Sequence, residues 1–179
     1  MFTIEGIPQL PNSHRIGVAP AATSRDVGRV TEKTDRHDTL QTIYKERLLQ
    51  LFRNPLGTET PDAAAIRGWA KNRSCGDEVA FYSLLSENGV AQCWHDTAGC
   101  AISTATSSLL VEALAGKSRE DARKLLDQIR AMVFEGKEVD VDDDVKILSA
   151  VHDLRTRHEC VGVALKAAEE SLEPKGSTE

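Results

Sequence analysis

The sequence predicts an α+β fold, in which a small antiparallel sheet of about three strands carries helices on one of its faces. Three observations predict it: β-rich runs gather in one stretch of the 179-residue chain, helical periodicity precedes and follows them, and strands do not alternate with helices. Hydrophobic residues make up 40% of the chain, which suits a single domain with a sizeable core.

The chain divides into an extension, a domain and a tail. Residues 1–37 hold three of the six prolines and no sustained periodicity, which predicts an irregular N-terminal extension. The domain is expected over residues 38–173, and a polar tail over 174–179. Charged and proline residues stand where a secretory signal would have its apolar stretch, which favours a cytoplasmic protein.

The first helix is predicted from Asp38, where Asp38 or Thr39 can cap its start. Asn54-Pro55, followed by Gly57, ends it. One helical face of this segment carries Leu40, Ile43, Tyr44, Leu48, Leu51 and Phe52.

The strands are expected next. Residues 65–69 read as an edge strand, and the β-rich runs 78–85 and 90–95 flank Ser86-Glu87-Asn88-Gly89. An Asn-Gly turn between two such runs predicts a β-hairpin.

Helical periodicity returns after Gly99-Cys100 and stops at Gly116. A capping box is expected at 118–121, opening a helix that ends at Gly136. A short helical piece at 145–150 and a last helix from Cys160 to Leu172 follow. The acidic run between these helices is expected to be a solvated loop or a helix N-terminus, and comprises Glu138, Asp140, Asp142, Asp143 and Asp144.

The charge balance excludes two classes of partner. A net charge of −6 argues against general nucleic-acid binding, which needs a basic face. The apolar runs are far shorter than the ~18 residues that span a bilayer, so no membrane association is expected.

Four cysteines carry the chemistry of the sequence, although none forms a CxxC pair. Cys75 lies in a polar, glycine-containing turn, whereas Cys100 and Cys160 open helices, where the dipole favours thiolate over thiol. With Asp77 they offer three thiolates and a carboxylate, a set suited to zinc or to iron and sulfide. The alternative is that Cys100 and Cys160 are buried small hydrophobes, which is the expectation for mid-strand Cys93.

The words around these cysteines resemble the IscU/NifU-like family of iron–sulfur cluster assembly proteins. They are Ser74-Cys75-Gly76-Asp77, then Gly99-Cys100-Ala101-Ile102-Ser103, then Arg157-His158-Glu159-Cys160, with a first helix that stops at Asn54-Pro55 as in that family. The resemblance covers roughly residues 38–172 and implies a SufE/NifU-like fold.

Within the family, the resemblance favours the SufU branch. Scaffold members carry a histidine before the third cysteine, and here that position is Glu159; the long gap between Cys100 and Cys160 also matches the SufU insertion. SufU proteins bind zinc through three cysteines and the aspartate, which here implies Cys75, Asp77, Cys100 and Cys160 as ligands. Arg157 matches an arginine that SufU proteins keep beside the metal.

The resemblance implies a sulfur relay. A SufS-like cysteine desulfurase would pass persulfide sulfur to Cys75, a partner histidine taking one ligand position on zinc, and other iron–sulfur assembly proteins would follow. Two alternatives stay open: a scaffold that builds a cluster on the same cysteines with Glu159 or His158, or a member whose metal is structural only. Two departures from the family are His95, which replaces an aromatic residue before Cys100, and Glu159, which stands where SufU proteins have lysine.

Overall fold

A computed structural model describes residues 31–173 of the chain. Most of the predicted extension, residues 1–30, and the predicted tail lie outside this range. The elements in chain order are α1 (Thr31–Arg53), β1 (Ile66–Lys71), β2 (Glu78–Ser86), β3 (Gly89–Ala98), α2 (Ala101–Leu114), α3 (Arg119–Glu135), α4 (Asp143–Lys146), the 3₁₀ turns η1 (Ile147–Val151) and η2 (Arg155–Arg157), and α5 (His158–Ser171).

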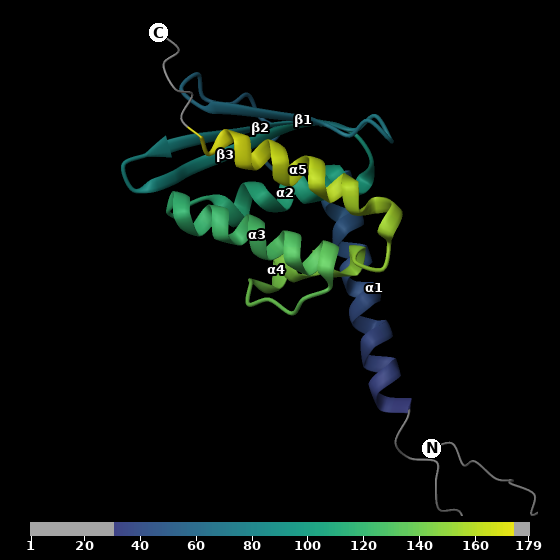
Figure 1. Cartoon of the computed structure of the whole chain (residues 1–179). Coiled ribbons are helices and arrows are strands. Elements are labelled where there is room, and N and C mark those ends of the chain that lie inside the picture. The colour runs from purple at the N-terminus through teal and green to yellow at the C-terminus, as the bar shows by residue number, and fades with distance from the viewer. Residues whose placement is uncertain (1–30, 174–179) are drawn as a thin grey trace, which may run out of the picture.

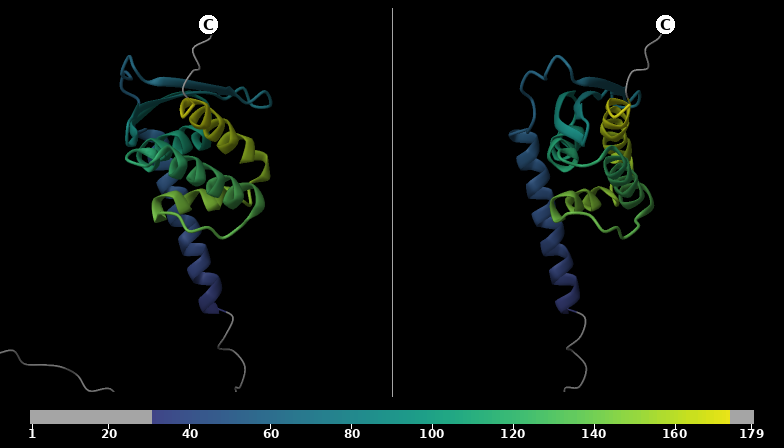
Figure 2. Two further views of the ribbon diagram at one scale, coloured as in Figure 1. Left: turned by 60° about the vertical axis from the view of Figure 1, so that its left-hand side comes forward. Right: turned by 90° about the vertical axis from the view of Figure 1, so that its left-hand side faces the viewer.

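The molecule is layered, with the sheet on one side and helices on the other (Figure 1). The three strands are antiparallel in the order β1-β2-β3, and α2 and α5 lie against one sheet face. α3 and η1 form a further layer beneath them, as the turned views in Figure 2 show. The predicted α+β class, with a three-stranded antiparallel sheet, is confirmed.

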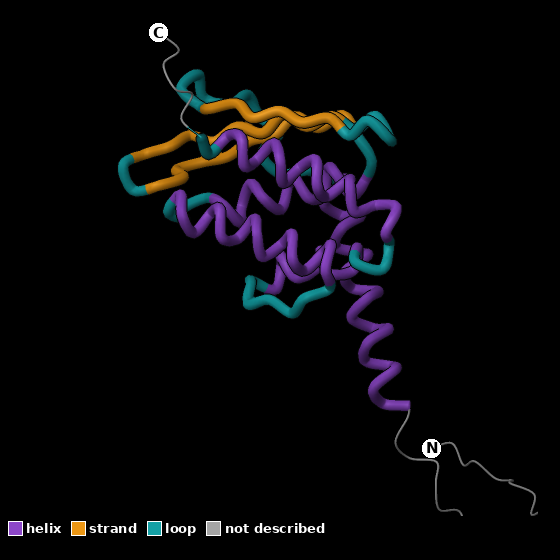
Figure 3. The backbone as a smooth tube through the Cα atoms, in the orientation of Figure 1, coloured by secondary structure: helices purple, strands orange, loops and turns teal. Residues whose placement is uncertain are grey.

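The predicted hairpin is confirmed as β2 and β3, which Figure 3 shows as the longest strands. Ser86 pairs with Gly89 across the turn, where Gly89 has a φ of 127° that favours glycine. Val79, Phe81 and Ser83 alternate along β2 and are fully buried beneath the helices. The period of two therefore fixes which face of the sheet receives the helices.

α1 differs from its prediction at its start and on its apolar face. It is already helical at Thr31, the first residue that the structure describes and well before Asp38, and its first turns extend beyond the other helices (Figure 2). Leu48 and Leu51 are buried against the domain, but Ile43 and Phe52 are exposed. The predicted stripe was too wide because α1 packs mainly against α2 and η1, along one side. Within residues 31–173, no helix is both long enough and apolar enough to cross a bilayer.

α3 has the ends that the sequence predicts. The Ser118 hydroxyl accepts a hydrogen bond from the Asp121 backbone N–H at 3.0 Å, and Gly136 closes the helix in the left-handed conformation with φ 68°. Ile129 and Val133 are fully buried on the apolar face between these caps. The cap and the stripe explain why this part of the long gap between Cys100 and Cys160 forms a helix.

β1 and α5 approach each other closely at Gly68. A Cβ atom on Gly68 would lie 2.0 Å from the Ala167 carbonyl oxygen and 2.6 Å from the Ser171 nitrogen. Ser171 also shares a buried 2.7 Å hydrogen bond with Ser83 of β2. These contacts place the C-terminal end of α5 over the start of β1, so its N-terminal end lies toward the other end of that strand.

Candidate metal centre

Three chain connections meet at one end of the sheet, where β1 and β3 end and β2 begins. Glu78, the first residue of β2, pairs with Lys71 at the end of β1 and with Ala98 at the end of β3. The β1–β2 turn and the β3–α2 connection therefore lie side by side, and the first turn of α5 reaches the same end of the sheet. Each of the three connections carries one of the predicted ligand cysteines.

Cys75, Asp77 and Cys160 form a compact group of ligand atoms. The two sulfurs and a carboxylate oxygen all lie within 4.8 Å of one another. Cys160 and Asp77 are buried, whereas Cys75 is exposed. The fold thus brings together residues that are up to 85 positions apart in the sequence.

The turn that holds Cys75 is closed at its base. The Asn72 backbone N–H donates to the Asp77 carbonyl at 2.8 Å, and the Asn72 side-chain oxygen accepts from the Ser74 N–H at 2.9 Å. Gly76 has a φ of 82°, and a Cβ placed on it would meet no atom within 4 Å. Cys75 is thereby presented on a solvent-facing tip, while Asp77 points inward.

Cys100 lies beside this group and is half-buried. It precedes the first residue of α2, and its backbone N–H donates to Asp77 Oδ1 at 3.2 Å. Its thiol is close enough to lower the pKa of the Asp77 carboxyl and to raise that of the Cys160 thiol. Its sulfur is outside the set of atoms within 4.8 Å of one another, so the predicted fourth ligand is adjacent to the cluster rather than part of it.

The charge state of Asp77 follows from its neighbours. Burial acts to raise the pKa of its carboxyl, but the neighbouring polar groups of Cys100, Cys75, Ser103 and Cys160 outweigh burial and hold that pKa below its usual value. The carboxylate is therefore ionised at neutral pH and available as a ligand.

Cys160 departs from the expectation that a helix N-terminus favours thiolate. Burial is the largest cause that raises the pKa of its thiol, and Cys100, Asp77 and Cys75 raise it further. These neighbours oppose another negative charge more strongly than the α5 dipole supports one. A cation between the ligands reverses this balance, because coordination deprotonates a thiol outright.

The buried atoms of the cluster test whether a metal fits. Asp77 Oδ2 is buried without a hydrogen-bond partner, whereas buried carboxylate oxygens are normally paired. This oxygen belongs to the same residue whose ligand atom lies within 4.8 Å of two cysteine sulfurs. Thiolates with a carboxylate form a donor set that zinc accepts, so the residues present fit a tetrahedral cation.

Arg157 and Glu159 remain outside the cluster. Both side chains are exposed, and in the described part of the chain the Arg157 guanidinium makes no ion pair. The His158 ring turns away as well, because its Nε2 donates to the His152 carbonyl at 2.8 Å. His152 is half-buried, and its Nδ1 in turn donates to the Val133 carbonyl at 2.9 Å.

His95 and Cys93 are buried in β3 and do not enter the described cluster. The His95 ring bonds to Thr97 at 2.9 Å and to Ser108 at 3.2 Å, and burial lowers its pKa to about 4. Cys93 is 1% exposed, and burial raises the pKa of its thiol to about 11. The prediction that Cys93 belongs to the core is confirmed.

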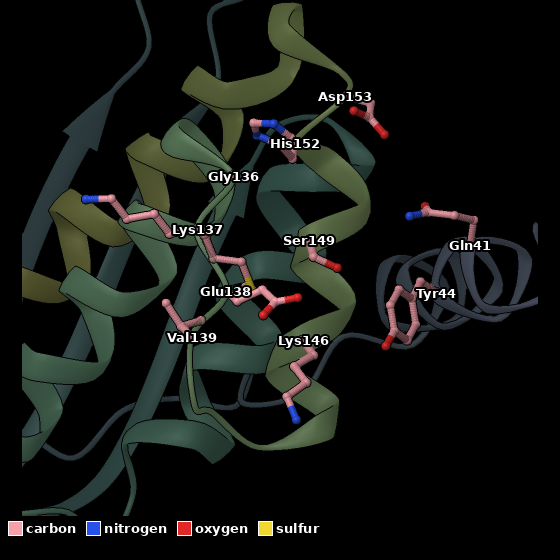
Figure 4. Close-up of a pocket in the computed structure, with 11 residues that line it drawn as sticks. Gln41, Tyr44, Gly136, Lys137, Glu138, Val139, Lys146, Ser149, His152 and Asp153 are labelled. Atoms are coloured by element: carbon pink, nitrogen blue, oxygen red, sulfur yellow. The ribbon is translucent and has the colours of Figure 1, made fainter. Parts of the chain in front are cut away.

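A separate hollow lies between α1 and the η1 region. It has a volume of about 640 Å³ and is lined by residues that include Tyr44, Glu138, Ser149 and His152 (Figure 4). It contains none of the cysteines, and in Figure 4 the Lys137 side chain points away from Tyr44 and Gln41. The cluster of cysteines and Asp77 at the end of the sheet is thus separate from this hollow.

Fold and site together define a small α+β protein with a thiol–carboxylate site at one end of its sheet. The chain belongs to the NifU-like N terminal domain family, whose model matches residues 43–161. The IscU protein of Thermotoga maritima, named an iron–sulfur cluster assembly scaffold protein, is 27% identical over 132 residues, which cover 73% of this chain and 92% of that protein. The SufU protein of Bacillus subtilis, named a zinc-dependent sulfurtransferase, is 26% identical over 136 residues, covering 74% and 91%.

Solved structures give the same grouping. FiSufU, a SUF-system protein from Fervidobacterium islandicum AW-1, superposes with a TM-score of 0.67 at 27% identity, covering 74% of this chain and 98% of that one. The N-terminal part of a NifU-like protein from Brucella abortus has a TM-score of 0.63 at 22% identity, covering 74% and 94%, and it supports the fold alone.

Proposed function

We propose that this protein works in iron–sulfur cluster assembly as a sulfur acceptor of the SufU type. Zinc would be its resident metal, held by Cys75, Asp77, Cys100 and Cys160. The observation that carries the proposal is the cluster of two cysteine sulfurs and an Asp77 carboxylate oxygen within 4.8 Å, together with the buried, unpartnered Oδ2 of Asp77. The relatives named for cluster assembly and for zinc-dependent sulfur transfer support it.

Zinc suits this donor set better than a hard cation does. Sulfur ligands select zinc or iron–sulfur clusters, whereas magnesium and calcium prefer all-oxygen sites. When bound, zinc would keep the three thiols deprotonated at neutral pH. The protein's own contribution is to ionise Asp77 and to bring Cys160 into reach despite its raised pKa.

Cys75 is the residue that we assign as sulfur acceptor. Cys75 is the exposed member of the set, and a Cβ added at the adjacent Gly76 would meet no atom within 4 Å. Cys100 and Cys160, in contrast, are anchored at the starts of α2 and α5. The Cys75 thiolate would attack the terminal sulfur of a persulfide on the desulfurase. A new S–S bond forms at Cys75, the partner's S–S bond breaks, and the partner's cysteine leaves as a thiolate.

This exchange conserves electrons, because one sulfane sulfur moves from one cysteine to another. It needs no oxidant beyond the persulfide itself. The partners are then a SufS-like cysteine desulfurase, which supplies the sulfur, and iron–sulfur assembly proteins, which consume it. We expect this exchange in the cytoplasm, where thiols stay reduced.

Two features support the SufU branch. Glu159 precedes Cys160 in the position where scaffold members have histidine, and a complete capped helix, α3, lies between Cys100 and Cys160. Arg157 is proposed to meet the partner or the transferred sulfur, since its side chain is exposed and it precedes Cys160 by three residues.

The test is stimulation of a purified cysteine desulfurase by the zinc-loaded chain, measured as sulfide or alanine production. Cys75→Ala should abolish stimulation, and Cys93→Ala, which removes a buried thiol away from the site, should retain it. Full stimulation by Cys75→Ala would overturn the assignment of the acceptor.

A cluster scaffold is the second candidate function. The name of the Thermotoga maritima relative favours it, and the same donors accept iron and sulfide. Anaerobic reconstitution separates the two, because a scaffold gives a stable coloured cluster and a zinc relay stays colourless. In a third case the metal is structural: its removal would unfold the chain, and no desulfurase would respond to the protein.

A further inference from the structure

Ser103 lies one helical turn beyond Cys100 and points back toward the cluster. It is fully buried, and its hydroxyl donates to the Cys100 carbonyl at 2.9 Å, with the Cys100 sulfur 3.8 Å away. The Asp77 carboxyl lies nearby, and Ser103 is among the neighbours that lower its pKa. A single side chain thus bonds to one of the four proposed ligands and lies beside a second.

The backbone at Gly99 holds Ser103 and Asp77 close together. A Cβ atom on Gly99 would lie 2.5 Å from the Ser103 hydroxyl oxygen and 2.9 Å from the Asp77 carboxyl carbon. A side chain at residue 99 would collide with both groups, so only glycine fits at this position. Gly99 therefore allows the Ser103 hydroxyl and the Asp77 carboxyl to lie on either side of the same backbone position.

The charge of the proposed site creates a need for hydrogen-bond donors. Three thiolates and one carboxylate carry two more negative charges than a divalent cation neutralises. A buried surplus of charge is costly unless donors point at it. Within residues 31–173, the Ser103 hydroxyl is a donor within reach of the Cys100 sulfur, and the Cys100 N–H is a backbone donor to Asp77.

The hydroxyl has one proton, so the partner that accepts most strongly receives it. In the thiol form of Cys100 the backbone carbonyl is the shorter contact, at 2.9 Å against 3.8 Å. Once Cys100 is a thiolate, its sulfur becomes a charged acceptor, and hydrogen bonds to charged acceptors are roughly twice as strong as neutral ones. A rotation of the Ser103 side chain would then direct the hydroxyl proton from the Cys100 carbonyl to the Cys100 sulfur.

Cys75 lacks this support. It is exposed on its turn, and in the described part of the chain no hydroxyl donates to its sulfur. The three cysteines are therefore unequal: Cys160 is buried, Cys100 is braced by Ser103, and Cys75 is free of both constraints.

We propose that Ser103 is a positioning residue that keeps Cys100 and Asp77 as permanent ligands, so that Cys75 is the ligand that exchanges. This inference rests on the proposed zinc site and names a residue outside its ligand set. Ser103 acts through Cys100 and Asp77 and takes no part in the sulfur transfer itself.

Ser103→Ala tests the proposal, with Ser107→Ala as a matched control. Ser107 is equally buried in the same helix, and its hydroxyl bonds to the Ser103 carbonyl and to Thr97 instead of the ligands. Zinc affinity, measured by competition with a chromophoric chelator, should fall about 10–100-fold in Ser103→Ala, as for other residues that orient metal ligands. Ser107→Ala should bind zinc as the wild type does.

Two further readouts separate positioning from packing. In the zinc-loaded wild type, a thiol-alkylating reagent should modify Cys75 first, and in Ser103→Ala modification of Cys100 should accelerate toward the rate of Cys75. Ser103→Thr keeps the hydroxyl and should recover most of the affinity. Equal losses in Ser103→Thr and Ser103→Ala would assign the effect to packing and overturn the proposal.

Wild-type zinc affinity and unchanged Cys100 protection in Ser103→Ala would also overturn the role of Ser103, while leaving the zinc site intact. A wild-type chain that binds no zinc would instead remove the proposed function on which the role depends. The two failures are therefore distinguishable in one titration series.

Discussion

Gly68→Ala gives a sharp test of how the fold positions the site. An alanine Cβ would lie 2.0 Å from the Ala167 carbonyl oxygen and 2.6 Å from the Ser171 nitrogen, both of which are backbone atoms that cannot rotate away. Overpacking a core typically costs about 1–3 kcal/mol, and two backbone clashes place this variant at the upper end, about 3 kcal/mol. For a chain of this length, such a loss lowers Tm by about 6–12 °C.

The assay is thermal and urea unfolding followed by circular dichroism, together with zinc content. Because α5 carries Cys160, a displaced α5 should also weaken metal binding. Gly162→Ala is the control: its Cβ would meet the Phe134 ring at 3.2 Å, and replacing a helical glycine gains up to about 1 kcal/mol. A Gly68→Ala chain with the Tm and zinc content of the wild type would refute the close approach of β1 and α5.

The remaining predictions concern pH, capping and metal. The buried His95 has a folded-state pKa of about 4, below its unfolded value, so between about pH 6.5 and pH 4 the unfolded chain binds the extra proton and stability falls with pH. Urea unfolding should show a loss of about 2 kcal/mol from this group between pH 7 and pH 5, and His95→Phe should flatten that dependence; an unchanged slope would contradict the burial of a neutral ring. Ser118→Ala removes the cap of α3 and should cost about 1 kcal/mol by the same measurement, with zinc affinity unchanged; no loss would contradict the cap. Zinc at about 1,000 times its Kd should stabilise the chain by about 4 kcal/mol, which a chelator removes, whereas equal Tm values with and without chelator would contradict a bound metal.

The sequence predicted the elements well where local chemistry decides them. The Asn-Gly turn at 88–89, the Ser118 cap and the Gly136 stop each encode their structure within a few residues, so the hairpin and α3 follow from them. The capping residues Asp38 and Thr39 were misleading, because both lie inside α1. Its apolar stripe overstated burial at Ile43 and Phe52 because tertiary contact, which periodicity alone does not report, covers only one side of the helix.

The candidate site was predictable in its membership more than in its geometry. Cys75, Asp77 and Cys160 meet as their motifs suggest, but Cys100 lies beside them, and the thiol pKa of Cys160 is raised where the helix dipole alone predicted the opposite. That sign depends on burial and on three neighbouring acidic groups that come together only in the folded chain. Ser103 was missed for a similar reason, although its spacing of three from Cys100 at a helix start is the signal that reveals it.

X-ray absorption at the zinc edge of freshly purified protein, with metal content by mass spectrometry, tests the central claim most directly. The proposal predicts about one zinc per chain in a shell of three sulfurs at about 2.3 Å and one oxygen at about 2.0–2.2 Å. Asp77→Ala should remove the oxygen, and Cys160→Ala should remove one sulfur. A wild-type chain without zinc, or a zinc shell that keeps its three sulfurs in Cys160→Ala, would contradict the proposed metal centre.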